Sequence, residues 1–109
     1  MSRVLTIEDF QSLVGEVFQV SPAEQSNVEI PQAEIVLAEV NDTTDKLGRH
    51  ALEFLPRVPF SLIFEGSPQT PLPQAYCRLT HPSMPPIEHL LVPVFDPRPE
   101  KRQYEMLFS

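Results

Sequence analysis

Proline is the residue that most limits what this chain of 109 residues can fold into, because it occurs 13 times while glycine occurs only 3 times. Proline breaks the hydrogen-bond ladder of a helix when it lies in the helix interior. Long proline-free stretches occur only at residues 1–21 and 32–55. Any substantial helix must lie in one of these two stretches, so the sequence excludes a helical bundle.

The first proline-free stretch predicts a short helix over residues 6–14. Thr6 and Asp9 have the spacing of a capping box, and Gly15 supplies the left-handed residue that ends many helices. The apolar residues of one face recur at helical spacing: Ile7, Phe10, Leu13 and Val14. A helix of about two turns is not stable alone, so we expect it to dock on a larger unit.

The rest of the chain predicts strands. The clearest segment places Phe60, Leu62 and Phe64 on one face of a strand and the next three alternate residues on the other: Ser61, Ile63 and Glu65. Six segments have this alternation or a dense apolar composition: residues 16–20, 33–40, 58–65, 75–81, 87–95 and 102–108. Pro59 and Pro93 fall inside two of them, so each should lie at a strand start, an edge or a bulge.

These elements together predict a mainly β protein with one domain spanning residues 1–109. Its architecture is a small antiparallel β-barrel or sandwich of about six strands with a short N-terminal helix. We expect eight residues to form the centre of its core: Phe10, Phe18, Phe60, Leu62, Phe64, Leu79, Tyr104 and Phe108.

Two segments leave alternatives open. Residues 32–40 suit a helix by propensity, but Ile35, Val36 and Val40 favour a strand. Residues 41–57 form a long loop or insertion, which could hold a short helix over 45–55 or extend the following strand.

The charge of the chain indicates which partners are excluded. Fifteen acidic and eight basic residues give a net charge of −7, which opposes binding to nucleic acid or to an anionic membrane surface. The longest uncharged stretch, residues 66–77, contains three prolines, so it cannot span a bilayer. Glu8 and Asp9 lie where a signal peptide would need an apolar run, so we expect a cytoplasmic protein, with signal-less export left open.

His81 and His89 are the strongest candidates for a metal site, and they remain weak ones. They flank the sequence Pro82–Pro86, which we expect to form the hairpin connection between two strands. If the strands pair symmetrically about Pro85, the two imidazoles face each other with Cβ atoms roughly 5 Å apart. A stable site needs a third and usually a fourth ligand, so we expect both histidines to be structural.

No constellation in the sequence predicts catalysis. Cys77 and His81 lie on the same face of one predicted strand, but four residues of strand separate them by about 13 Å. A nucleophile and its base must approach to about 3 Å. Cys77 therefore fits a core position. The carboxylates form a solvated surface, and the three glycines form no phosphate-binding loop. We expect no catalytic residue, no cofactor and no bound metal.

An ordered string of motifs resembles an uncharacterised family of small bacterial proteins, classed only as a domain of unknown function. The motifs are Pro59-Phe60-Ser61-Leu62-Ile63-Phe64-x-Gly66, Leu72-Pro73-Gln74, Tyr76-x-x-Leu79-x-His81-Pro82, Leu91-Val92-Pro93-Val94 and Tyr104-Glu105-x-x-Phe108. The resemblance implies a bacterial source and a small, mostly β domain, but no activity. It also points toward relatives encoded beside phage-tail-like fibre proteins.

The residues and the resemblance together favour a non-enzymatic interaction or structural module, such as an accessory of a phage-tail-like particle. We expect its partner to be another protein or a second copy, bound through strand edges. The alternative is a small-molecule or metal-binding barrel that uses the region near His81 and His89. A deep polar pocket containing both histidines would favour that alternative.

Overall fold

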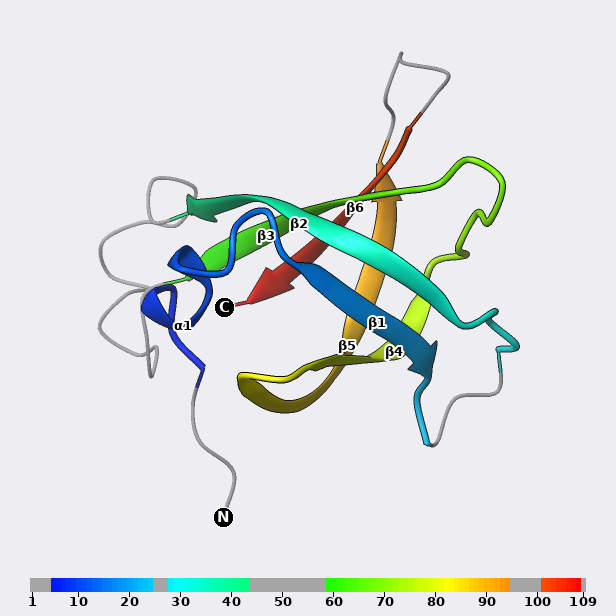
Figure 1. Cartoon of the computed structure of the whole chain (residues 1–109), viewed down its shortest axis with the longest axis horizontal. Helices are drawn as coiled ribbons and strands as arrows, with labels where there is room; N and C mark the ends of the chain where they lie inside the picture. The colour runs from blue at the N-terminus through cyan, green and yellow to red at the C-terminus, as the bar shows by residue number, and fades with distance from the viewer. Residues whose placement is uncertain (1–4, 25–27, 44–58, 95–100, 109) are drawn as a thin grey trace.

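The computed structural model describes residues 5–24, 28–43, 59–94 and 101–108. Figure 1 shows the elements in chain order: α1 (Glu8–Gln11), β1 (Val17–Pro22), β2 (Ala33–Asp42), β3 (Phe60–Gly66), β4 (Ala75–His81), β5 (Met84–Val94) and β6 (Arg102–Phe108). The prediction of a mainly β protein with a short N-terminal helix is confirmed. The segment 41–57 was expected to be a long loop or insertion, but its first two residues belong to β2; residues 44–57 lie outside the described ranges.

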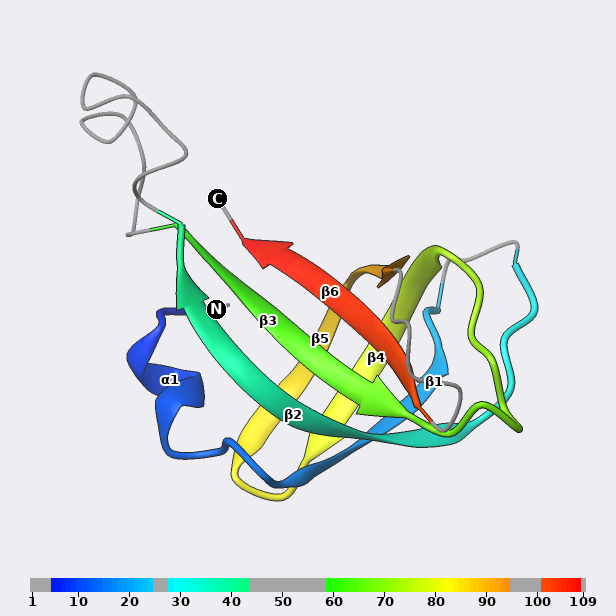
Figure 2. The same cartoon turned by 90° about the horizontal axis from the view of Figure 1, so that it is seen from above.

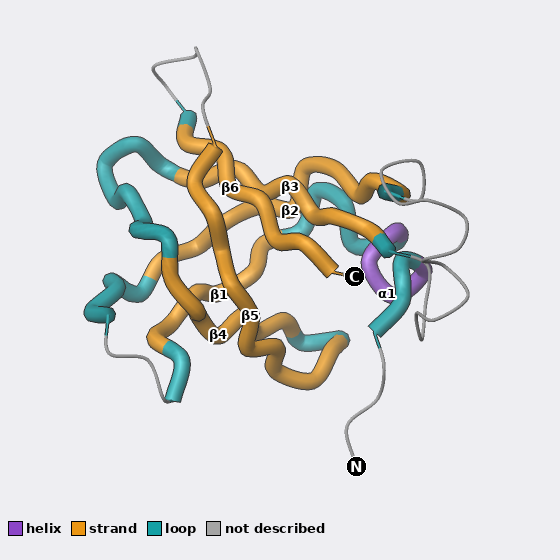
Figure 3. Tube along the Cα trace, turned by 180° about the vertical axis from the view of Figure 1, so that it is seen from behind, coloured by secondary structure: helices purple, strands orange, loops and turns teal. Residues whose placement is uncertain are grey.

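The strands form a closed barrel rather than a sandwich. Their order around the barrel is β1-β2-β3-β6-β5-β4, and every neighbouring pair is antiparallel. Figure 3 shows the strands curving around one another, with α1 beside the end of β6. The segment that could have been a helix forms β2, because its apolar residues are shared between a buried and a partly buried face.

The helix is shorter than the sequence predicts, since α1 covers only Glu8–Gln11 and Ile7 precedes it. The Asp9 carboxylate accepts a hydrogen bond from the Thr6 backbone N–H at 2.8 Å, which is one half of the expected capping box. Val14 is 48% exposed, so its assignment to the buried face is wrong. The chain turns away directly after α1, and a longer helix would have been needed to bring Val14 onto that face.

Gly15 has the left-handed conformation that the sequence predicts, with a φ of +90°, but the helix has already ended at Gln11. A Cβ at this position would meet nothing within 4 Å, so only the backbone conformation opposes a side chain there. We expect Gly15→Ala to lower the free energy of unfolding by about 1–2 kcal/mol in urea denaturation. Ser12→Ala, in the same turn at a φ of −80°, is the matched control and should change it by less than about 0.5 kcal/mol. Equal stability of the two variants would contradict this reason.

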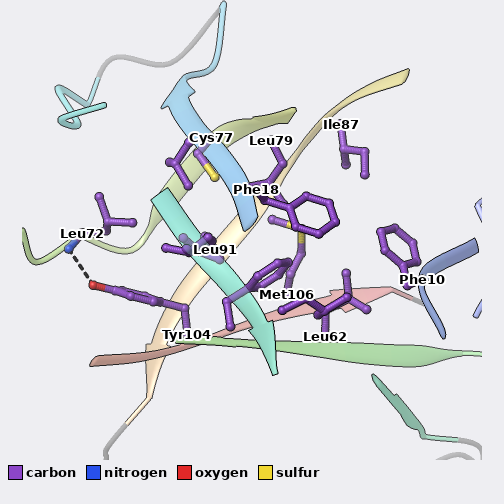
Figure 4. Packing of buried hydrophobic residues seen from close by; sticks show 14 of the residues in the cluster. Phe10, Phe18, Leu62, Leu72, Cys77, Leu79, Ile87, Leu91, Tyr104 and Met106 are labelled. Carbon is purple, nitrogen blue, oxygen red and sulfur yellow. Dashed lines mark hydrogen bonds between the residues drawn. The ribbon is translucent and has the colours of Figure 1, made fainter. Parts of the chain in front are cut away.

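The inward faces of all six strands fill the barrel with side chains. The eight expected core residues are each at most 2% exposed, so that prediction is confirmed. Figure 4 shows that the cluster has two ends, with Phe10 of α1 at one and Leu72 of the β3–β4 loop at the other. The ring centroid of Phe10 lies 5.7 Å from that of Phe60. The Leu72 backbone N–H donates a hydrogen bond to Tyr104 Oη at 2.9 Å, which fastens the loop over its end.

The hairpin between β4 and β5 differs from the prediction. Its turn is Pro82-Ser83, because His81 pairs with Met84 and β5 already begins there. Pro85 and Pro86 therefore belong to the strand, where a register shift sets two β5 residues opposite one β4 residue. The bulge accommodates them because proline has no N–H to donate to the ladder. The expected symmetry about Pro85 is wrong.

The two prolines expected at special strand positions are found there. Pro59 immediately precedes β3. Pro93 pairs with Tyr104 of β6, but the pairing of β5 with β4 has ended at Leu91, so one side of Pro93 lies at a strand edge. Both prolines lie where the ladder is incomplete, which is where a residue without a backbone N–H is tolerated.

Candidate functional site

His81 ties the end of the β4–β5 hairpin to the start of β1. Its Nε2 lies 2.6 Å from Glu16 Oε1, and its Nδ1 accepts a hydrogen bond from the Ser83 backbone N–H at 3.0 Å. An accepting Nδ1 assigns the proton of the neutral ring to Nε2, which donates to Glu16. The ring packs on Phe18 at 4.9 Å, and the side chain is only 5% exposed. Both nitrogens are therefore engaged in holding the turn.

His89 closes the gap between β5 and β6. The register of these strands runs only from Val92–Glu105 to Val94–Gln103. Beyond it, His89 Nε2 donates to the Leu107 carbonyl oxygen at 2.6 Å. The imidazole also stacks on Phe108, with centroids 4.3 Å apart and planes within 4°. A side-chain hydrogen bond thus joins the two strands beyond the end of their ladder.

The structure does not bring the two histidines together. The cross-strand partner of His89 is Cys77, and that of His81 is Met84. The pairing of His89 with Cys77 was missed from the sequence, because it depends on the two-residue turn that sets the register. Among the residues that the structure describes, no group of three or more His, Cys, Asp or Glu is placed to hold a metal ion.

The histidine contacts lead to a prediction for zinc. Coordination at either Nε2 would break a 2.6 Å hydrogen bond, and among the described residues neither imidazole belongs to a group of three possible ligands. We therefore expect micromolar zinc to leave the Tm of the protein unchanged, since only tight binding to the folded state raises it. The control is the double variant His81→Ala, His89→Ala. A rise in Tm for the parent that disappears in this variant would contradict the prediction.

Cys77 is a core residue, as the sequence predicts, with 1% of its surface exposed. Burial raises the pKa of its thiol from 9.0 to about 11. The reactive thiolate is the charged form that an apolar site disfavours, so this cysteine is held in its unreactive form near neutral pH. Packing in the core is therefore enough to explain this cysteine, and no nucleophilic role is needed.

The raised thiol pKa predicts how stability depends on pH. The thiol ionises at a higher pH in the folded than in the unfolded protein, so the unfolded chain releases its proton first. The stability contribution is complete below pH 9.0 and is lost as pH rises toward about 11. We expect the free energy of unfolding to fall relative to Cys77→Ala by about 1 kcal/mol per pH unit across this window, measured by urea denaturation. Parallel pH profiles of the two proteins would contradict it.

A pocket of about 360 Å³ opens where β3 leaves β2. Figure 2 shows the loop after β3 passing beside the start of β2. The lining consists of one strand segment and the opposing turn: Gln32, Ala33, Glu34, Ile35, Gly66, Ser67 and Thr70. Neither His81 nor His89 belongs to it. This pocket was missed from the sequence, where only Gly66 marks the point at which β3 ends.

Glu34 is the charged residue of this lining. Its Oε2 accepts a hydrogen bond from Gln19 Nε2 of β1 at 2.7 Å, which holds the carboxylate on the β1 side of this lining residue. A carboxylate has further acceptor positions, so this bond leaves capacity for a second donor. The pocket therefore combines backbone groups of a strand edge with one oriented negative charge.

The fold and these sites place the protein in the class of small closed antiparallel β-barrels. Its interior is filled with side chains, and its described part has a pocket beside the start of β2. The chain belongs to the family described as Domain of unknown function (DUF6916), which matches residues 5–108. No curated protein and no solved structure matches the chain. Within the described residues, no helix is long and apolar enough to cross a membrane.

Proposed function

We propose that the protein is a non-enzymatic interaction module, an accessory of a larger bacterial assembly such as a phage-tail-like particle that forms in the cytoplasm. The observation that carries this proposal is the start of β2, where a strand edge faces an open pocket instead of another strand. Open edges bind extended segments of other proteins through backbone hydrogen bonds. The net charge of −7 supports a protein partner over nucleic acid or an anionic membrane.

The roles of the histidines and the cysteine support an interaction module over a binding or catalytic barrel. His81 and His89 hold the hairpin and the seam, and neither lines the pocket. Cys77 is buried with its thiol pKa raised. The side chains best suited to chemistry near neutral pH are thus part of the framework of the barrel.

The proposal is tested by sedimentation in a bacterium that carries the gene. The chain is tagged, the cells are lightly cross-linked, and the lysate is separated on a density gradient. We expect part of the chain to sediment with a large particle, whose proteins are then identified by mass spectrometry. The tag fused to an unrelated small protein is the control. Recovery of the whole chain with the small free proteins would overturn the proposal.

A further inference from the structure

The first residues of β2 have a strand partner on one side only. Residues 33–36 pair with residues 17–20 of β1. On the opposite side, pairing with β3 begins at Val36, which faces Glu65. In an antiparallel ladder, backbone groups alternate between the two neighbouring strands. The Leu37 backbone N–H and C=O bond to Glu16 and Gly15 on the β1 side, so the backbone groups of Ile35 and Ala33 also point toward β1. Of residues 33–35, Glu34 is the one whose backbone N–H and C=O point away from β1, and among the described residues no strand lies opposite it.

The turn after β3 forms the far wall of this opening. The Thr70 backbone N–H donates to the Ser67 carbonyl oxygen at 3.2 Å, and the Gln69 N–H donates to Ser67 Oγ at 3.1 Å. These local bonds hold the turn away from β2 and leave the pocket of about 360 Å³ between them. That volume lies near the lower end of the range for ligand pockets.

The seam between β5 and β6 is less suited to an added strand. His89 reaches across it to Leu107, so a strand could enter only by displacing that side chain. Pro85 and Pro86 lie on the same part of β5 and have no N–H to offer a partner. The residues 33–35 of β2 are not prolines, and an open pocket lies beside them.

The charge at the pocket selects among extended segments. Glu34 is the charged residue of the lining, and the whole chain carries a net charge of −7. A segment with lysine or arginine would be attracted over the surface and could donate to this carboxylate, whereas an acidic segment would be repelled.

We propose that the pocket binds an extended, lysine- or arginine-bearing segment of a partner protein, which pairs with the backbone N–H and C=O of Glu34 at the edge of β2. Backbone hydrogen bonds supply the attachment, and Glu34 supplies the preference for positive charge. This inference rests on the proposed interaction function and assigns it a site and a class of partner.

The test uses two capped tetrapeptides as probes, Lys-Val-Lys-Val and Glu-Val-Glu-Val, added to the full chain labelled with ¹⁵N. We expect the basic peptide alone to shift amide signals of residues 32–35 and 66–70, with a dissociation constant on the order of 1 mM for so short a segment. Absence of shifts up to several times that concentration, or shifts centred on the β5–β6 seam, would overturn the proposal.

Two variants separate the role of Glu34 from that of net charge. Glu34→Lys should reverse the preference, so that the acidic peptide binds at least as well as the basic one. Glu39→Lys is the matched control, because it makes the same charge change on an exposed position of β2 outside the pocket lining. It should retain the preference for the basic peptide. Equal behaviour of the two variants would overturn the role of Glu34.

The outcome for the pocket is distinguishable from the outcome for the function. If neither peptide binds but the tagged chain still sediments with a particle, the inference about the pocket fails and the interaction function stands. If the basic peptide binds but the chain stays with the small free proteins, the function as an assembly component fails.

Discussion

Replacing Phe64 by alanine is expected to lower the free energy of unfolding by about 3–5 kcal/mol, because it removes a ring from the fully packed centre of the barrel. Phe64 is 0% exposed and lies on β3 between Leu37 of β2 and Tyr104 of β6. Its ring meets that of Phe18 edge to face at 5.5 Å. The change therefore leaves a cavity bordered by three strands that the closed ladder prevents from collapsing.

Ile63→Ala is the matched control for this substitution. Ile63 is the neighbouring residue on β3, but it faces outward and is only partly buried. We expect it to cost about 1 kcal/mol, since part of its surface is already in contact with water. Both variants are measured by urea denaturation at equilibrium. A loss under about 1 kcal/mol for Phe64→Ala, or a larger loss for Ile63→Ala, would show that the faces of β3 are assigned the wrong way round.

The strands could be predicted because their signal is local. In β3 the period of two that joins Phe60, Leu62 and Phe64 is complete within one short segment, and it places three side chains in the core. The end of the helix was harder to predict. Val14 has helical spacing from Phe10, but its exposure depends on where the chain turns toward β1, and that turn is fixed by the barrel.

The hairpin register could not be predicted from residue types alone. Consecutive prolines are typical of a turn, so Pro85 and Pro86 were assigned to the connection. In the barrel they are accommodated by a bulge, and the turn shortens to Pro82-Ser83. This shift separates His81 from His89 and gives each a different contact. A slip in register changes every cross-strand pair beyond it, which is why the histidine geometry was wrong while the strand itself was right.

The pocket beside β2 has no sequence motif because it is made by strand separation. Its walls come from residues 32–35 and 66–70, which are joined only through the register of β2 with β3. Gly66 is its one marker in the sequence. A Cβ there would approach Ile35 Cγ2 and Tyr104 Cε2 at 3.2 Å, so the absence of a side chain lets β3 end close against these two residues.

Tyr104→Phe is expected to lower the free energy of unfolding by about 1–3 kcal/mol, although it removes a single oxygen atom. The Tyr104 hydroxyl accepts a hydrogen bond from the Leu72 backbone N–H, and both residues are at most 5% exposed. A buried donor that loses its acceptor retains its desolvation cost, which is what the substitution would measure. The matched control is Tyr76→Phe, because Tyr76 is 57% exposed and its loss of a hydroxyl should change stability by less than about 0.5 kcal/mol.

The same substitution should also act on the loop that Leu72 anchors. Without the bond to Tyr104, the Leu72 amide loses its acceptor, so we expect its hydrogen exchange to accelerate more than that of amides in the centre of β3. Because Ser67 and Thr70 lie in the same loop and line the pocket, loosening it should weaken binding of the basic peptide while Tyr76→Phe leaves binding unchanged. Unchanged exchange at Leu72 and unchanged stability would show that the hydroxyl does not fasten this end of the barrel.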